Sequence, residues 1–262
     1  MKTIGGHQLL SMTFPRLPVS ERWYGILGRL PEFFYGIVYG NSGEGKTEFC
    51  VQLAIELSRF GKVEWVSYEQ GHGPDLQDAA ARNNVQNYPI SFSNPWVSTK
   101  RKANKVVLNY PRCKNERINQ LFEELIMKIA AKKSAKFWFI DSADTCKFTK
   151  EMCEYLRTTV GARKGILFIG HGKGGEPKSG LGQDIEFNGS IGFYVEHFIA
   201  YPNKSRWQGN KPLVIVEHLA RERNPLFFEF ANKPAKVTAK KKEKPARKPR
   251  VKKIVEPEKI EA

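Results

Sequence analysis

The sequence predicts an α/β fold in which a mostly parallel sheet carries helices on both faces and an antiparallel extension at one edge. Two observations support this prediction. Between residues 34 and 170, short apolar runs alternate with longer amphipathic segments, which is the pattern of strand–helix–strand units around a parallel sheet. After residue 190, apolar runs follow one another without an intervening helical segment, and such strands favour antiparallel pairing.

Each element is predicted from its own local pattern. Strands are expected where apolar residues cluster between turn residues, and helices where apolar residues recur every three or four positions. The helix at 115–133 has the clearest spacing, with a stripe of Ile118, Leu121, Phe122, Leu125, Ile126 and Ile129. The expected helices are 20–30, 48–60, 75–83, 115–133 and 150–162; the expected strands are 34–39, 62–69, 88–92, 137–140, 165–170, 193–201 and 213–219, the last with a hairpin partner at 226–230.

Composition divides the chain into an N-terminal arm (1–20), a core (21–230) and a basic C-terminal tail (231–262). Pro15 and Pro18 discourage regular structure in the arm. The tail is rich in Lys, Pro and Ala, so it cannot bury enough apolar surface to offset its chain entropy, and we expect it to be disordered.

Bulk composition narrows the class of protein. The chain has 262 residues, of which 40% are apolar, enough for one substantial core. It contains no apolar run of about 18 residues that would span a membrane, and its first residues lack the apolar segment of a signal peptide. The four cysteines, Cys50, Cys113, Cys146 and Cys153, are scattered, which is typical of free thiols in a reducing compartment. We therefore expect a cytoplasmic protein with no membrane partner.

Charge points to a polyanionic partner. The net charge is +16, and the segment from Lys233 to Ala262 holds twelve Lys or Arg residues against four Glu. Such a tail can hold nucleic-acid phosphates without sequence specificity, strengthened by counterion release. A solubilising tail or a protein-docking arm is the alternative interpretation.

One motif predicts a nucleotide site. Residues Gly40, Asn41, Ser42, Gly43, Glu44, Gly45, Lys46 and Thr47 match the pattern G-x-x-x-x-G-K-[ST] in full. The motif lies between a predicted strand and a predicted helix, where backbone N–H groups and the helix N-terminus attract phosphate. Lys46 is expected to reach the β- and γ-phosphates of ATP, and the Thr47 hydroxyl to ligate Mg²⁺.

Two carboxylates complete the predicted site. Asp141 ends a predicted strand, where it can hold the Mg²⁺ through water opposite Thr47. Glu69 ends the strand that follows the phosphate-loop helix, at the sheet edge where ligands bind, and is expected to polarise the attacking water. Many phosphate-loop ATPases carry their base directly after the strand-end Asp. Here Ser142 occupies that position, which favours Glu69 as the base.

A pair of cations lies further along the chain. Lys204 and Arg206 flank Ser205, and in an extended segment they project the same way. They can stabilise the charge that develops on a transferring phosphoryl group. Taken alone, an exposed basic turn is the more economical interpretation.

In their order and approximate spacing, these segments resemble the RecA-like ATPase superfamily, in particular its RadA, DnaB-helicase and KaiC branches. The resemblance covers about residues 22–220 and rests on Gly40–Thr47, Val66–Glu69, Phe137–Ser142, the glycine-rich stretch Gly170–Gly180, and the K-x-R sequence at Lys204. It implies a RecA-type core that assembles with copies of itself into a ring or filament. ATP then lies between subunits, and Lys204 and Arg206 act on the neighbour's site.

The sequence also departs from these relatives. Trp23–Pro31 replaces the usual segment before the phosphate loop, and Gly71–Cys113 is longer and more basic than a minimal core needs. Zinc-ribbon cysteines, a protease-like domain and a helicase N-terminal domain are not found in the sequence. A compact phage-type ATPase of recombination or replication fits best, with replication or recombination proteins as further partners and a bacterial or phage-infected cytoplasm as its location.

Nucleic acid, and single-stranded DNA in particular, is expected to meet the glycine-rich loop 171–183 through Lys173 and Lys178, together with the basic residues at 100–105. A nucleotide-sensing switch without DNA contact is the alternative for this loop. His171 is expected to sense the γ-phosphate through a hydrogen bond, and the alternative is an ordinary loop histidine. Trp96 and Trp207 are candidate stacking platforms, although such residues more often pack.

Three functions remain open from the residues. The first is a Mg²⁺-dependent ATPase that handles DNA in recombination, annealing or replication. The second is a KaiC-like regulatory ATPase that controls protein partners without DNA. The third is a nucleotide-dependent adaptor with little hydrolysis. The basic tail favours the first function.

Overall fold

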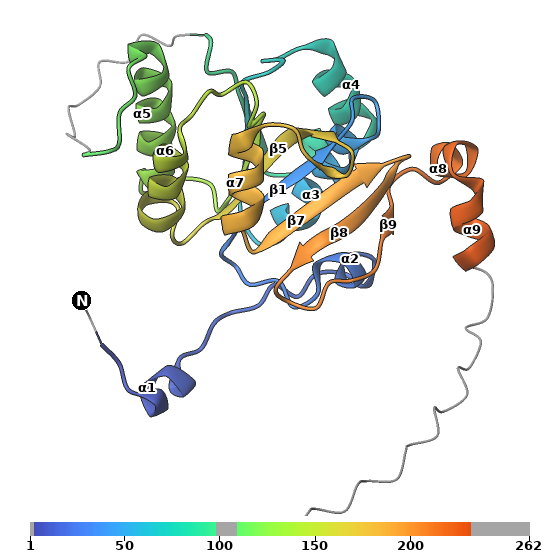
Figure 1. The fold of residues 1–262 in the computed structure, drawn as a ribbon, viewed down its shortest axis with the longest axis horizontal. Helices are drawn as coiled ribbons and strands as arrows, with labels where there is room; N and C mark the ends of the chain where they lie inside the picture. Colours follow the sequence, from blue (N-terminus) through green and yellow to red (C-terminus); the bar gives the residue numbers. More distant parts are fainter. Residues whose placement is uncertain (1–2, 98–108, 232–262) are drawn as a thin grey trace, which may run out of the picture. The chain divides into compact units, whose positions relative to one another are not determined.

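The computed structural model describes residues 3–97 and 109–231, and a single large sheet forms its centre (Figure 1). The helices are α1 (Gly6–Ser11), α2 (Glu21–Leu27), α3 (Lys46–Ser58), α4 (Pro74–Arg82), η1 (Val85–Asn87), α5 (Glu116–Ala130), α6 (Lys150–Tyr155), η2 (Leu156–Val160), α7 (Gly180–Asn188), α8 (Glu217–Arg223) and α9 (Pro225–Ala231). The strands are β1 (Phe34–Gly40), β2 (Val63–Ser67), β3 (Ile90–Ser93), β4 (Phe137–Asp141), β5 (Gly165–Lys173), β6 (Glu176–Pro177), β7 (Ile191–Glu196), β8 (Ile199–Ser205) and β9 (Leu213–Val214).

The strand order confirms the predicted fold class. Within the described residues the order is β3-β2-β4-β5-β1-β7-β8-β9, and β6 pairs with β5 outside this series. Strands β3, β2, β4, β5, β1 and β7 are mutually parallel, whereas β8 and β9 add to one edge in the antiparallel sense. All parallel strands therefore end at one edge of the sheet, and the loops that follow them meet there.

Alternation along the strands explains why both faces carry helices. In β1, Phe34 and Val38 pack in one apolar cluster with residues of α2, α3 and α4. Tyr35, Ile37 and Tyr39 pack in the other cluster with residues of α5, α6 and α7, which cover that face in Figure 1. Side chains of β1 alternate between the two faces, but both faces are covered and every residue is buried. The sequence of β1 is therefore continuously apolar and does not alternate between apolar and polar residues.

The expected single strand at 193–201 is wrong, because the chain reverses inside it. β7 and β8 form an antiparallel hairpin in which Glu196 pairs with Ile199. The two tip residues, His197 and Phe198, have positive φ angles of 52° and 57°. A two-residue turn of this kind is usually signalled by Asn or Gly, and neither residue type occurs here.

The expected strand at 213–219 and its hairpin partner at 226–230 are also wrong. Only Leu213 and Val214 pair with β8, and the chain then enters α8 at Glu217 and α9 at Pro225. The four β-favouring residues at 213–216 suggested a long strand, but the edge of the sheet accommodates only the first two.

Three smaller differences concern the arm, one helix and the glycine-rich stretch. The arm contains the short helix α1, none of whose residues is buried, and Leu17 at its end is only 5% exposed. The helix expected at 150–162 is α6 followed by a π-helical turn, η2. The glycine-rich loop expected at 171–183 consists mostly of regular structure: β5 runs to Lys173, the chain turns at two glycines of positive φ into β6, and α7 begins at Gly180.

The chain divides into two units, Met1–Pro225 and Leu226–Ala262. The predicted basic tail, apart from Ala231, and the basic residues at 100–105 lie outside the described residues. Among the helices of residues 3–97 and 109–231, none combines the length and apolar character that crossing a membrane requires.

Candidate active site

The phosphate loop follows the end of β1 and leads directly into α3. Gly43 and Gly45 have φ angles of +78° and +99°, which L side chains rarely adopt. Gly45 also faces the ring of Phe198, where an added Cβ would lie 2.7 Å from the nearest ring carbon. Both the backbone conformation and the close approach therefore require glycine at position 45.

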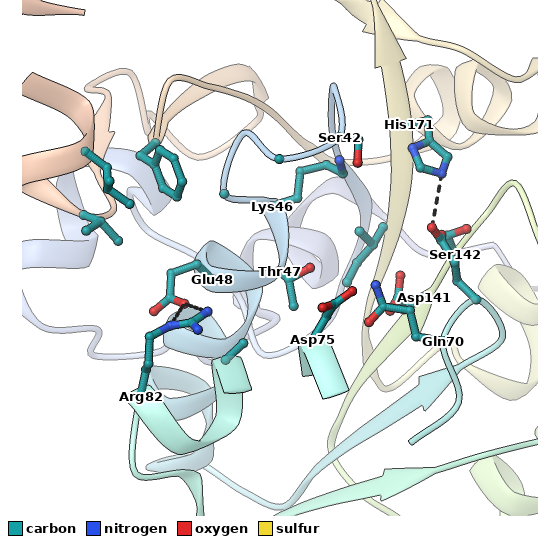
Figure 2. A pocket seen from close by; sticks show the side chains of 18 of the residues that line it. Ser42, Lys46, Thr47, Glu48, Gln70, Asp75, Arg82, Asp141, Ser142 and His171 are labelled. Atoms are coloured by element: carbon teal, nitrogen blue, oxygen red, sulfur yellow. Dashed lines mark hydrogen bonds and ion pairs between the residues drawn. The ribbon is translucent and has the colours of Figure 1, made fainter. Parts of the chain in front are cut away.

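The loop opens onto a cavity of about 730 Å³. Ser42, Gly43, Gly45, Lys46 and Thr47 line it, and Figure 2 shows the side chains of Ser42, Lys46 and Thr47 along one wall. The other three motif residues are not among the described residues that line the cavity. Gly40 is the last residue of β1, the Asn41 carbonyl accepts a 2.7 Å hydrogen bond from Lys46 Nζ, and Glu44 contacts the β7–β8 tip.

Lys46 is a partly desolvated cation surrounded by carboxylates. Burial lowers the pKa of Lys46, while the negative charges of Glu69 and Asp141 act in the opposite direction. With its single hydrogen bond to the loop carbonyl, the ammonium group is held over the loop on the side of the cavity. A polyphosphate bound in the cavity would give the Lys46 ammonium group stronger, charge-assisted hydrogen bonds than the Asn41 carbonyl does.

Asp141 and Glu69 meet at the carboxyl edge of the sheet. Asp141 ends β4 opposite Ser67 of β2, and the chain continues from Ser67 to Glu69. The Asp141 carbonyl accepts hydrogen bonds from the backbone N–H groups of Tyr68 and Glu69, the second at 3.1 Å. Burial and the nearby charge of Glu69 raise the pKa of Asp141 to about 7.

The donor atoms here suit Mg²⁺. The Thr47 hydroxyl and the Asp141 carboxylate line the same cavity, and oxygen donors are what Mg²⁺ prefers. A cation between them would also offset the unfavourable charge of a carboxylate that is only 8% exposed. No group of three or more His, Cys, Asp or Glu side chains forms a metal cluster in the part of the chain that the structure describes. A bound Mg²⁺ would therefore take its other ligands from nucleotide phosphates and water.

His171 lies beside the phosphate loop, although not in a loop as predicted. It belongs to β5 and pairs in register with Gly40 at the end of β1. Its backbone N–H donates to Asp144 Oδ2 at 2.7 Å, and its Nε2 lies 3.4 Å from Glu69 Oε1. The structure thus brings the predicted base and the predicted sensor into contact.

Lys204 and Arg206 lie at the opposite edge of the sheet. Lys204 is in β8, and its neighbour Ser205 pairs with Ile191, which in turn pairs with Gly36 near the start of β1. Neither cation is among the described residues that line the cavity. Lys204 Nζ donates to the carbonyl oxygens of Glu186 and Phe187 at the end of α7, at 2.8 and 2.6 Å. Arg206 is exposed in the turn after β8.

Several cavity residues were missed by sequence reasoning. The turn after β2 and α4 supply Gln70, Asp75, Ala79 and Arg82. The hairpin tip supplies Phe198, the residue before α8 is Val216, and α8 supplies His218 and Leu219. Figure 2 shows Gln70 and Asp75 near Asp141, and Arg82 beside Glu48. Arg82 donates to Glu48 Oε2 at 3.1 Å, which ties α4 to the first turn of α3. No short motif marks these positions, because long-range packing alone brings them to the cavity.

The hairpin tip and α8 contact the phosphate loop at Gly43 and Glu44. The backbone N–H of Phe198 donates to the Glu44 carbonyl at 3.1 Å, and that of His197 donates to the Glu44 carboxylate. From α8, Arg223 donates to the Gly43 carbonyl at 3.1 Å and lies over the Phe198 ring at 4.9 Å. These contacts hold the loop from its β7 side, at the same carboxyl edge of the sheet.

Comparison with solved structures identifies the fold. A KaiC-like protein from the hyperthermophilic archaeon Pyrococcus horikoshii OT3 is 16% identical and has a TM-score of 0.51; the match covers 74% of this chain and 92% of that protein. The flagellar accessory protein FlaH from Methanocaldococcus jannaschii is 13% identical with a TM-score of 0.46, covering 77% and 97% of the two chains. No protein-family model matches the sequence, and no curated protein does either.

The likeness to the KaiC-like protein, together with the strand order and the phosphate loop, confirms the predicted fold. The chain has the RecA-like P-loop fold.

Proposed function

We propose that this chain is an ATP hydrolase that uses Mg²⁺ and acts on DNA, with single-stranded DNA as its ligand. The observation that carries the ATPase proposal is the convergence on one cavity of the phosphate loop, Asp141 and Glu69. In a RecA-like fold, these are the parts that phosphoryl transfer to water requires: a phosphate cradle, a metal site and a base.

Each residue has a distinct task in the proposed reaction. The loop N–H groups and Lys46 would hold the β- and γ-phosphates. Thr47 and Asp141 would hold Mg²⁺, which would supply positive charge to the phosphate oxygens when bound. Water attacks the γ-phosphorus, the bond to the β–γ bridging oxygen breaks, and ADP leaves. Glu69 accepts the proton of the attacking water. His171, in contact with Glu69, reports on the γ-phosphate.

Two substitutions test the assignment. Lys46→Ala should abolish nucleotide binding, measured with a fluorescent ATP analogue, because it removes the cation over the phosphates. Glu69→Gln should leave binding within about twofold but slow turnover by about 100-fold or more, since it removes the base. Normal turnover in Glu69→Gln would refute its role.

Action on DNA is supported by charge. The chain carries +16 overall, and Lys173 and Lys178 are exposed on the segment that follows His171. Cations at this position can contact phosphates without reading bases, close to the residue proposed to sense the nucleotide.

The DNA proposal predicts that single-stranded DNA stimulates ATP turnover at about 50 mM salt and less so at about 200 mM salt, because phosphate contacts release counterions. Lys173→Ala/Lys178→Ala should weaken the stimulation, whereas Lys132→Ala/Lys133→Ala, two exposed lysines after α5, should not. Unchanged turnover and no DNA retention at low salt would favour the KaiC-like regulatory function instead.

A further inference from the structure

We propose that Trp96 is a positioning residue for Glu69: its indole N–H fixes the peptide bond that precedes the base. This inference rests on the proposed role of Glu69 in ATP hydrolysis. It assigns to Trp96 a task in the reaction that neither the phosphate-loop motif nor the strand-end carboxylates indicate.

The contact that carries the inference is a single hydrogen bond. Trp96 Nε1 donates to the Tyr68 carbonyl at 2.9 Å. The N–H of the same peptide unit belongs to Glu69 and donates to the Asp141 carbonyl at 3.1 Å. Both polar groups of the peptide bond before Glu69 are therefore held, and its plane cannot rotate without breaking one of them.

Strand order explains why the two contacts come from opposite sides. β2 lies between β3 and β4 in the sheet. Asp141 ends β4 on one side, and Trp96 follows the end of β3 on the other. The peptide before Glu69 is thus bracketed at the sheet edge by the chain segments that leave its two neighbouring strands.

Trp96 is itself held in place. Its backbone N–H donates to Asn94 Oδ1 at 3.0 Å, and its ring meets Tyr68 edge to face, with centroids 6.3 Å apart. Tyr68 is 2% exposed, and its ring centroid lies 5.4 Å from that of Phe148. This packing holds the residue whose carbonyl accepts the indole hydrogen bond. The Arg117 guanidinium lies 6.0 Å from the Trp96 ring centroid.

Glu69 depends on this backbone support. Its carboxylate has one side-chain contact among the described residues, the 3.4 Å approach of His171 Nε2. The backbone at Glu69 fixes the Cα–Cβ direction from which the side chain reaches toward the cavity, and the His171 contact then limits where its carboxylate lies. A rotation of the peptide at Tyr68 would move the base away from the attacking water, and small displacements of this kind slow catalysis strongly.

Exposure argues against a purely packing role for Trp96. The residue is 47% exposed, and the following Val97 is 64% exposed. A tryptophan that served only to fill the core would be buried. Here the ring remains at the surface while its N–H reaches inward to one backbone carbonyl, so the hydrogen bond is the main interaction that substitution would remove.

Trp96→Phe tests the proposal, because it keeps an aromatic ring against Tyr68 and deletes only the N–H donor. We expect kcat for ATP to fall about 5- to 30-fold, while KM and the affinity for a fluorescent ATP analogue stay within about twofold. Tyr88→Phe, at another exposed aromatic residue close to β3, is the matched control. It should leave kcat, KM and the affinity for the ATP analogue unchanged.

The double variant separates positioning from a general structural effect. If Trp96 acts through Glu69, adding Trp96→Phe to Glu69→Gln should produce no further loss of kcat. An equal loss in both backgrounds, an unchanged kcat, or a fall in nucleotide affinity would each overturn the proposal. If Glu69→Gln alone turns over normally, the base assignment in the proposed function fails, which is a distinct outcome that the single variant reports by itself.

Discussion

Asp141 lies in surroundings that disfavour the charge of its own carboxylate. It is 8% exposed, and burial together with the charge of Glu69 raises its pKa to about 7. Because the pKa of this carboxyl is higher in the folded protein than in the unfolded chain, keeping it ionised above pH 7 opposes folding. A carboxylate retained at such a position is characteristic of function rather than stability.

Asp141→Asn should therefore stabilise the protein without nucleotide while removing the proposed ATPase activity. We expect the free energy of unfolding to rise by about 1 kcal/mol, or Tm by about 2–4 °C, measured by thermal unfolding without Mg²⁺ or ATP. Asp78→Asn, at an exposed position in α4, should leave Tm unchanged. A lower Tm in Asp141→Asn would contradict this account of the site.

At the scale of elements, the β7–β8 hairpin packs against the phosphate loop and holds it through contacts at Glu44 and Gly45. Its tip residues hold Glu44 through two backbone N–H groups, and the Phe198 ring covers Gly45. The local sequence at 196–199 carries no turn signal, because the positive φ angles of His197 and Phe198 are imposed by the pairing of the flanking strands. Sequence patterns therefore missed both the hairpin and its contact with the loop.

Phe198→Ala should weaken nucleotide binding by about 3- to 10-fold, because the loop loses its packing partner and the cavity loses part of its wall. The measurement is titration with a fluorescent ATP analogue. Phe187→Ala is the matched control, since Phe187 is 79% exposed and does not line the cavity within the described residues. Equal effects of the two substitutions would argue against a role for the hairpin tip.

At the scale of the whole molecule, the sheet separates the two halves of the proposed catalytic machinery. The phosphate loop follows the carboxyl end of β1, whereas Arg206 lies beyond the end of β8 that pairs near the start of β7. Arg206 therefore lies away from the phosphate loop of its own chain and does not line the cavity within the described residues. We propose that it acts in the site of a neighbouring copy, in a homo-oligomeric ring or filament. Lys204 already donates hydrogen bonds to two carbonyl oxygens of α7, so it is less available than Arg206 to act in a neighbour's site.

Mixing variants tests this intermolecular arrangement. Arg206→Ala and Lys46→Ala subunits, each inactive alone, should regain activity when mixed, because one supplies the loop and the other supplies the arginine. In a random one-to-one oligomer, roughly a quarter of the interfaces would be intact. Mixing Lys46→Ala with the double variant Lys46→Ala/Arg206→Ala is the control without rescue. Absence of rescue in mixtures shown to co-assemble would contradict action between subunits.

The sequence was sufficient for features that depend on neighbours along the chain. The strand–loop–helix around Gly40–Thr47 was predicted because glycine conformation and apolar spacing are local properties. Asp141 and Glu69 were predicted because each lies at or just beyond the end of an apolar run, and parallel strands bring such ends to one edge. The contact between His171 and Glu69 was not predicted, because it depends on which strands are neighbours.

By itself, then, the sequence determined the fold class, the phosphate loop and the residues around which an ATPase site can be proposed. The tertiary structure decided how these parts are arranged: that Phe198 covers the loop, that Trp96 reaches the peptide before Glu69, and that Lys204 and Arg206 lie at the far edge of the sheet. The physical reason is that strand order and register arise from long-range pairing and packing. No short stretch of the chain encodes them. The reversal at His197, for example, turns β8 back along β7, so that Lys204 and Arg206 lie away from the phosphate loop.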